Sequence, residues 1–315
     1  GQPAKAPAKA AAGELKTRDL RAESGGLKLR LVEKFRAGNE ESWKQNGKVI
    51  LLVHGATWAS RCTFDPDPEH GYSLMETLAD AGYDVFSVDL HGYGKSEASE
   101  EDASDAQSAW KDIDAAVEFI RSFRWVEKVH LLGYQWGSQP VLLYATQKPQ
   151  KINRLVLLGS RWKYVDGSVN AAPGPMRTLG QQASLLKPDD GDLDQEFVRR
   201  RAQVCRSEST QAPNGALRDL TKPSPIEPGK IKSPLLLIQG ERDGSPDGLK
   251  LVTQHTSRGL DALDAEGVLR GWAVVDDSLY VVPSEQADNE ETCLAMCLVD
   301  LLHTILRLLA FLRCR

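Results

Sequence analysis

The residues with the clearest chemical setting are Gly133-Tyr134-Gln135-Trp136-Gly137, which separate a short apolar run from a segment with helical character. Two glycines in this arrangement allow a tight strand-to-helix turn that presents the middle side chain at the end of the strand. A hydroxyl or thiol there would be a nucleophile, whereas the amide of Gln135 only donates and accepts hydrogen bonds. Ser138, three positions onward in the predicted helix, points elsewhere and does not replace it. The sequence therefore predicts a site shaped for nucleophilic chemistry without the nucleophile.

Strands and helices alternate around this turn. A continuous apolar run predicts a buried strand at residues 48–53, and largely apolar segments predict further strands at 83–89, 129–132, 152–158 and 233–239 and a last strand or pair of strands at 272–283. Helical spacing predicts helices at residues 72–81, 102–123, 138–146, 249–263 and 292–312. Residues 27–35 alternate as a strand of an early antiparallel hairpin. This order predicts an α/β fold with a mostly parallel, doubly wound sheet and right-handed crossovers.

The chain divides into four parts by composition. Residues 1–20 are expected to form a low-complexity Ala/Lys/Pro tail, with too little apolar material to fold. Residues 21–159 carry the first part of the core. Residues 160–232 are rich in proline, with one helical piece near 197–204, and are expected to form a cap or lid over the sheet edge. Residues 233–315 return to the core and end in a C-terminal helix.

Three motifs resemble the α/β-hydrolase superfamily, most closely its capped lipase, esterase and aminopeptidase-like group. They are His54-Gly55 after a strand, the run Asp89–Ser96 (DLHGYGKS), and the Gly133–Gly137 elbow, in that order and each at a strand end. The resemblance covers roughly residues 48–158 and 233 to the end. It implies an oxyanion hole formed by the backbone N–H groups of Trp136 and of Ala56 or its neighbour.

The resemblance also implies three catalytic positions, of which only one holds the expected residue type. Gln135 occupies the nucleophile position, and Gln286, after the last strand, occupies the place expected for the histidine base. Asp243, in Gly240-Glu241-Arg242-Asp243, matches the acid position. Two glutamines remove both nucleophile and base, while the backbone donors of an oxyanion hole do not depend on side chains.

Three functions follow as alternatives. The first is a catalytically inactive or repurposed homologue of a serine esterase or peptidase, acting as a ligand-binding or structural subunit. The second is an enzyme with non-serine chemistry, such as a lyase, cyclase or hydratase, that uses the oxyanion donors with Asp243, His54 or Tyr134. The third is a serine hydrolase of esters or amides that carries an engineered substitution at Gln135. The expected partner is a small molecule in the cap pocket, or a protein that binds the N-terminal tail or the C-terminal helix.

Composition and local sequence patterns argue against several classes of partner, cofactor and metal site. The 315 residues carry a formal net charge of -5, which gives no basic field for nucleic acid. No dinucleotide fingerprint follows the first core strand, so no cofactor is expected. No uncharged apolar stretch is long enough for a membrane span. The five cysteines, at 62, 205, 293, 297 and 314, lack metal-site spacing, so no metal is expected. Their scatter favours a reducing compartment, or an organelle reached after removal of a targeting peptide.

Overall fold

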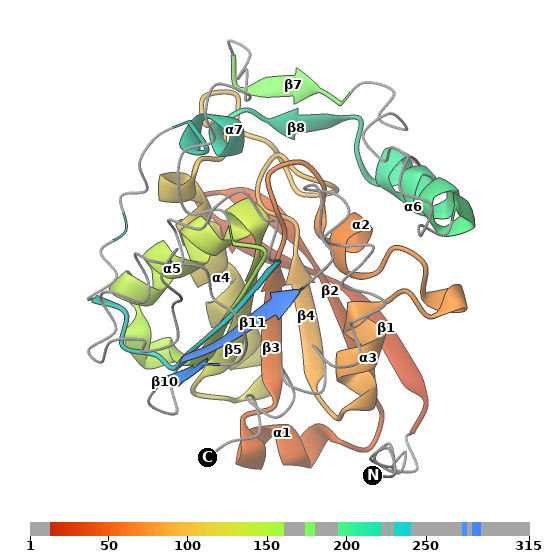
Figure 1. Ribbon diagram of the computed structural model, residues 1–315, viewed down its shortest axis with the longest axis vertical. Coiled ribbons are helices and arrows are strands. Elements are labelled where there is room, and N and C mark those ends of the chain that lie inside the picture. The colour runs from red at the N-terminus through yellow and green to blue at the C-terminus, as the bar shows by residue number, and fades with distance from the viewer. Residues whose placement is uncertain are drawn as a thin grey trace.

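The computed structural model describes residues 13–160, 174–179, 195–221, 226, 230–240, 273–275 and 279–284. These residues build a nine-stranded sheet in the order β1-β2-β4-β3-β5-β6-β9-β11-β10 (Figure 1). Its strands are β1 Leu15–Ser24, β2 Leu27–Arg36, β3 Val49–Val53, β4 Asp84–Val88, β5 Val129–Tyr134, β6 Ile152–Leu158, β9 Leu235–Gly240, β10 Ala273–Val275 and β11 Leu279–Ser284. A separate two-stranded sheet pairs β7 (Met176–Thr178) with β8 (Gln211–Pro213).

The centre of the large sheet is parallel and its margins are antiparallel. Strands β4, β3, β5, β6, β9 and β11 pair in parallel, while β1–β2, β2–β4 and β10–β11 pair antiparallel. Every residue of β3 and of β4 is buried, because parallel strands in such a fold are covered on both faces. The predicted α/β class, the mostly parallel sheet and the early hairpin are confirmed.

Helices cover both faces of this sheet (Figure 1). They are α1 Glu40–Asn46, α2 Ser60–Phe64, α3 Leu74–Asp80, α4 Ala106–Arg124, α5 Ser138–Gln147, α6 Gln195–Glu208 and α7 Gly215–Asp219, with short 3-10 turns η1 Pro68–His70, η2 Gln135–Gly137 and η3 Pro149–Lys151. Neighbouring residues of a strand point to opposite faces. Accordingly, Leu51 joins the core formed with α4 and α5, whereas Leu52 joins the core formed with α3.

Helix capping explains where two predicted helices begin. The helix predicted from residue 72 begins at Leu74, because the Ser73 hydroxyl accepts a hydrogen bond from the Glu76 N–H. The helix predicted from residue 102 begins at Ala106, because the Asp105 carboxylate accepts a hydrogen bond from the Ser108 N–H.

The first strand corrects one expected boundary. β1 begins at Leu15, so residues 15–20 belong to the sheet and not to the low-complexity tail expected to reach residue 20. In β1 the sequence alternates polar and apolar residues only weakly, because most of its side chains are exposed at the margin of the sheet. The helices predicted at 249–263 and 292–312 lie outside the described residues.

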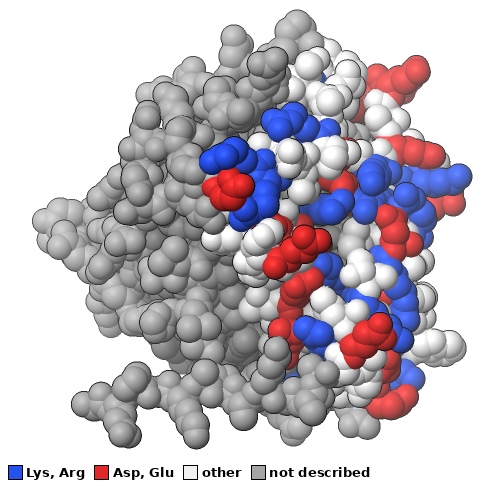
Figure 2. Space-filling model, turned by 90° about the vertical axis from the view of Figure 1, so that its right-hand side faces the viewer, with Lys and Arg blue, Asp and Glu red and all other residues white. Residues whose placement is uncertain are grey.

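Elements from the predicted cap segment lie beyond the ends of the central strands. Figure 1 shows α6, α7, β7 and β8 on the side of the sheet where the loops that follow β3 and β4 begin. On the face shown in Figure 2, blue and red side chains are interspersed over the described elements. Within the described residues, no helix is both long and apolar enough to cross a membrane.

Candidate functional site

The strand-to-helix elbow keeps the backbone geometry of a nucleophile turn. Gln135 follows β5 with φ +51°, a left-handed conformation that non-glycine residues adopt at a cost. A Cβ atom on Gly137 would lie 2.2 Å from the carbonyl oxygen of His54, and one on Gly133 would lie 2.8 Å from the Cα of Ser138. Both glycines are therefore required by close backbone approach, as the sequence motif predicts.

The side chain of Gln135 lies against the loop that follows β3. A Cβ atom placed on Gly55 would be 2.6 Å from Gln135 Oε1 and 3.2 Å from Gln135 Cβ. The sheet produces this contact, because β3 and β5 are parallel neighbours in which Val53 pairs with Gly133. The His54-Gly55 motif and the elbow, which are far apart in the sequence, therefore meet at the carboxyl edge of the sheet.

The His54 ring is held by hydrogen bonds to the backbone around it. Its Nε2 atom accepts a hydrogen bond from the Leu90 N–H at 3.2 Å, and its Nδ1 atom lies 2.8 Å from the Gly55 carbonyl oxygen. A neutral ring protonated at Nδ1 satisfies both contacts. Complete burial lowers the pKa of His54, although the Asp89 charge opposes the shift. Both ring nitrogens of His54 therefore contact backbone groups, and its role in the non-serine alternative stays a prediction.

The two residues expected to supply oxyanion donors are both held in place. Ala56 is buried, and its carbonyl oxygen accepts hydrogen bonds from Tyr93 Oη and Arg177 Nη2, each at 2.8 Å. Trp136 is fully buried, and its Nε1 donates to Asp219 Oδ2 at 3.0 Å. These contacts hold Ala56, in the loop after β3, and Trp136, directly after Gln135. The donor role of their N–H groups stays a prediction.

A small pocket opens beside Gln135, with a volume of about 50 Å³. Its lining residues are Gly55, Thr57, Trp58, Thr63, Tyr134, Gln135 and Arg201. Arg201 comes from α6 and is only 5% exposed, and its Nε donates to the Cys62 carbonyl oxygen at 3.4 Å. None of these lining residues is acidic. The lining therefore combines the Arg201 guanidinium with the Gln135 amide and with hydroxyl groups.

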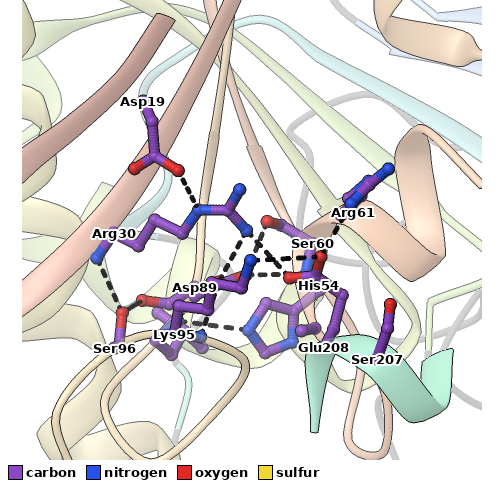
Figure 3. A network of polar contacts seen from close by, with 12 residues as sticks. Asp19, Arg30, His54, Ser60, Arg61, Asp89, Lys95, Ser96, Ser207 and Glu208 are labelled. Atoms are coloured by element: carbon purple, nitrogen blue, oxygen red, sulfur yellow. Dashed lines mark hydrogen bonds and ion pairs between the residues drawn. The ribbon is translucent and has the colours of Figure 1, made fainter. Parts of the chain in front are cut away.

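Helix α6 is fastened to the core by a buried ion cluster (Figure 3). Glu208 is buried, and its carboxylate lies 2.8 Å from Arg30 Nη1 and 3.1 Å from Arg61 Nη1. Arg30 also contacts Asp19 at 2.8 Å and Asp89 at 3.7 Å. Burial alone would lower the pKa of Arg30, but the Asp89, Glu208 and Asp19 carboxylates raise it above its ordinary value.

A disulfide adds a covalent connection to the same helix. Cys62 of α2 and Cys205 of α6 are bonded, with their Cα atoms 5.1 Å apart and a sequence separation of 143 residues. Sequence reasoning treated these cysteines as scattered thiols and used them to favour a reducing compartment. The bond removes that support, because disulfides persist chiefly under oxidising conditions.

The Asp89–Ser96 run forms a structural turn, as its resemblance implies. The Asp89 carboxylate accepts hydrogen bonds from the Ser60 N–H at 2.9 Å, the Ser60 hydroxyl at 2.6 Å and the Lys95 N–H at 3.1 Å. His91 Nδ1 contacts Asp112 Oδ2 at 2.6 Å, and its Nε2 lies 3.3 Å from Asp102 Oδ1. These contacts place His91 within the turn and outside the pocket lining.

The remaining two catalytic positions, Asp243 and Gln286, lie outside the described residues. The strands before them are placed: β9 ends at Gly240, β11 ends at Ser284, and these two residues pair in a parallel register. Both strands run parallel to β5, so their carboxyl ends meet the same sheet edge as the elbow. The roles assigned to Asp243 and Gln286 stay predictions.

Arg201 is the site residue that sequence reasoning missed. Its signal was present in the helical spacing of α6, where Phe197, Arg201, Cys205 and Glu208 follow one another at intervals of three or four residues. All four are buried. Because Arg201 shares this helical stripe with a phenylalanine and a cysteine, it could have been assigned to the buried face of α6. Within the described ranges, no cluster of His, Cys, Asp or Glu is placed to hold a metal ion.

Comparison with known proteins agrees with this geometry. A family model described as alpha/beta hydrolase fold matches residues 48–223. A 2-hydroxy-6-oxononadienedioate/2-hydroxy-6-oxononatrienedioate hydrolase 2 from Pseudomonas putida is 32% identical over 228 residues, covering 63% of this chain and 72% of that protein. A proline iminopeptidase from Lacticaseibacillus rhamnosus is 30% identical over 115 residues, covering 36% of this chain. That match spans only 35% of the peptidase's own length.

Solved structures share the same architecture. An esterase from Exiguobacterium antarcticum superposes with a TM-score of 0.63 at 16% identity, covering 94% of this chain and 100% of that one. A hydrolase from Pseudomonas aeruginosa gives the same TM-score at 15% identity, covering 95% and 98%. At such identities the likeness concerns the fold alone. The elbow, the loop after β3 and the matched residues 48–223 together show that the chain belongs to the α/β hydrolase fold family.

Proposed function

We propose that this protein is a non-hydrolytic member of its family that binds a small carboxylate-bearing molecule beside the elbow. One observation carries the proposal: the nucleophile position holds Gln135, whose backbone keeps the elbow conformation while its side chain lies against Gly55. The turn is intact and the attacking atom is missing. A primary amide does not form the acyl-enzyme intermediate that serine hydrolases require.

Three hydroxyls of the described residues near the elbow are engaged in other contacts. Ser138 is fully buried, and its Oγ donates to the Gly133 carbonyl oxygen at 3.1 Å. Ser60 Oγ donates to the Asp89 carboxylate at 2.6 Å, and Thr63 Oγ1 donates to the Ala59 carbonyl oxygen at 3.1 Å. Each of these hydroxyls is engaged in holding the local backbone. This supports binding over covalent catalysis.

The chemistry of the pocket favours an acidic ligand group. Arg201 contributes a guanidinium, whose planar N–H groups match a carboxylate, and Gln135 and Thr57 can add neutral donors. A volume of about 50 Å³ admits a carboxylate group, because a single water-sized group needs only about 10–15 Å³ by this kind of measure. The Pseudomonas putida relative is named for a dioate, a substrate with two carboxylates.

Restoring the missing residues tests the loss of hydrolysis. The parent protein and the double variant Gln135→Ser/Gln286→His are assayed with p-nitrophenyl acetate, beside a Gln135→Ala control. We expect turnover above background only in the restored form, since it alone has both nucleophile and base. Turnover by the folded parent protein would contradict a non-hydrolytic role if the Gln135→Ala variant shows it too and if it disappears when the protein is denatured.

Carboxylate binding is tested separately by calorimetry. Acetate is titrated into the parent protein, with acetamide as the isosteric neutral ligand. We expect acetate to bind and acetamide to bind at least about tenfold more weakly, a difference of about 1.4 kcal/mol. Arg201→Gln should abolish this preference, whereas Arg199→Gln on the exposed side of the same helix should not. Equal binding of the two ligands would show that charge plays no part.

A further inference from the structure

We propose that the Cys62–Cys205 disulfide limits the size of the elbow pocket: the oxidised protein keeps the pocket small, and reduction by a dithiol lets α6 move away and enlarge it. The identity of the ligand rests on the function proposed above, but the opening of the pocket does not. The bond joins two walls of the pocket. Cys62 lies in α2, directly after the loop that contributes Gly55, Thr57 and Trp58, and Cys205 lies in α6, which contributes Arg201.

The pocket of the oxidised protein is too small for most small-molecule ligands. Its volume of about 50 Å³ compares with roughly 300–1,000 Å³ for ordinary small-molecule sites. A ligand larger than a carboxylate group therefore enters only if one wall moves. The α2 wall is fixed to the sheet, because the Ser60 N–H and hydroxyl both bond to the buried Asp89 carboxylate. In the proposal α6 is the wall that moves, because its buried ion pair with the sheet, between Glu208 and Arg30, lies at one end of the helix.

Apart from the disulfide, the connections of α6 that the structure describes are noncovalent. Arg200 Nε contacts Asp67 Oδ2 at 2.5 Å, and the Phe197 ring lies 4.2 Å from the Tyr72 ring. Glu208 contacts Arg30 and Arg61 at the end of the helix (Figure 3). Such contacts open and re-form in local fluctuations, whereas a covalent bond does not. Reduction therefore changes the amplitude of α6 motion while the ion pairs still allow it to return.

The local charge favours the reduced products. Arg61 directly precedes Cys62, Arg206 directly follows Cys205, and the Arg201 Nε donates to the Cys62 carbonyl oxygen. Cationic neighbours stabilise a thiolate, which is the leaving group when a disulfide is attacked. Cys205 is 3% exposed and lies next to the exposed Arg206 and Ser207, and we expect a reductant to approach it from this side.

The reaction is an ordinary thiol–disulfide exchange. A thiolate of the dithiol attacks one sulfur, breaks the Cys62–Cys205 bond and forms a mixed disulfide, releasing the other cysteine as a thiolate. The second thiol of the reductant then attacks the mixed disulfide and releases the remaining cysteine. The dithiol loses two electrons and becomes a cyclic disulfide, and the two cysteines become thiols after taking up its protons.

Chemical labelling of Arg201 tests the opening without any ligand. The folded protein is treated with phenylglyoxal, before and after reduction by dithiothreitol, and modification at Arg201 is measured by mass spectrometry. We expect the labelling rate to rise at least about tenfold on reduction, equivalent to about 1.4 kcal/mol in opening free energy. Arg199, whose side chain is already 73% exposed, serves as the internal control and should not change.

Variants separate the bond from general effects of the reductant. Cys205→Ser should show the fast labelling with or without dithiothreitol, and Cys314→Ser should behave as the parent. Circular dichroism checks that Cys205→Ser stays folded, and hydrogen exchange of α6 against that of β3 gives a second readout if labelling is slow. Unchanged Arg201 labelling and α6 exchange on complete reduction would overturn the proposal. If reduction opens the pocket but acetate binds to neither the oxidised nor the reduced protein, only the proposed ligand is rejected.

Discussion

Gln135 Oε1 lies 2.6 Å from the point that a Cβ atom would occupy on Gly55. The nucleophile position and the loop after β3 are therefore in direct contact through a side chain longer than serine. Gly55 permits this contact because it has no side chain of its own. The glutamine at the elbow and the glycine opposite it thus form a matched pair, and each limits what the other position can hold.

This pairing predicts a compensating substitution. Gly55→Ala should lower the free energy of unfolding by about 1–3 kcal/mol, because the new methyl group meets the Gln135 amide. Gln135→Ser should relieve most of that loss, since its shorter side chain leaves the space open. Denaturant unfolding of the four proteins in this double-mutant cycle measures the coupling. Simple additivity of the two changes would show that the residues do not touch.

A second glycine provides the matched comparison. Gly137→Ala should destabilise the fold by more than Gly55→Ala, because its methyl group would lie 2.2 Å from the His54 carbonyl oxygen, a backbone atom that cannot rotate away. We expect a loss above about 3 kcal/mol, at the upper end for overpacking. Gln135→Ser should not rescue this variant. Rescue would indicate that the elbow rearranges as a unit.

The ion cluster at the end of α6 predicts unequal effects for its members. Glu208→Gln should lower the free energy of unfolding by about 3–5 kcal/mol, because it removes a buried partner from the buried Arg30. Arg61→Ala should cost less than about 1 kcal/mol, since that side chain is 42% exposed. Equal losses of unfolding free energy for the two variants in urea titrations would contradict the prediction that burial sets how much each residue contributes to the cluster.

His91 predicts a pH-dependent contribution to stability. Burial alone would lower the pKa of His91, but the hydrogen bond and charge of Asp112, with those of Asp102, raise it above the ordinary value of 6.5. A raised pKa in the folded state gives stability that is complete below pH 6.5 and disappears as pH rises through the folded pKa. Asp112→Asn removes the main partner, so this variant should lose less stability than the parent between pH 6 and pH 9. Parallel stability curves for the two proteins would contradict this assignment.

Trp125 predicts a stabilising change far from the pocket. This residue ends α4 with φ 56° and ψ 44°, and it is 81% exposed. Glycine adopts this left-handed conformation without the penalty of about 1–2 kcal/mol that a side chain brings. Trp125→Gly should therefore raise the free energy of unfolding by up to about 1 kcal/mol, whereas Trp125→Ala should not. A loss in thermal unfolding with both substitutions would show that the indole makes a stabilising contact.

The sequence by itself determined the parallel core and its elbow. The runs at residues 48–53, 83–89 and 129–132 are rich in apolar residues because these strands are covered on both faces, and that enrichment is visible locally. The elbow glycines were equally visible, because close backbone approach excludes any side chain. The assignment of Gln135 to the turn needed no tertiary information.

Only the tertiary structure decided what faces that turn. The contact between Gln135 and Gly55 depends on β3 and β5 being neighbours, and Arg201 reaches the pocket because α6 packs beside α2. The Cys62–Cys205 bond spans 143 residues, and no local spacing encodes such a pairing. Pattern in a sequence reports on burial and turns within a few residues, whereas the composition of a site depends on which distant segments the fold brings together.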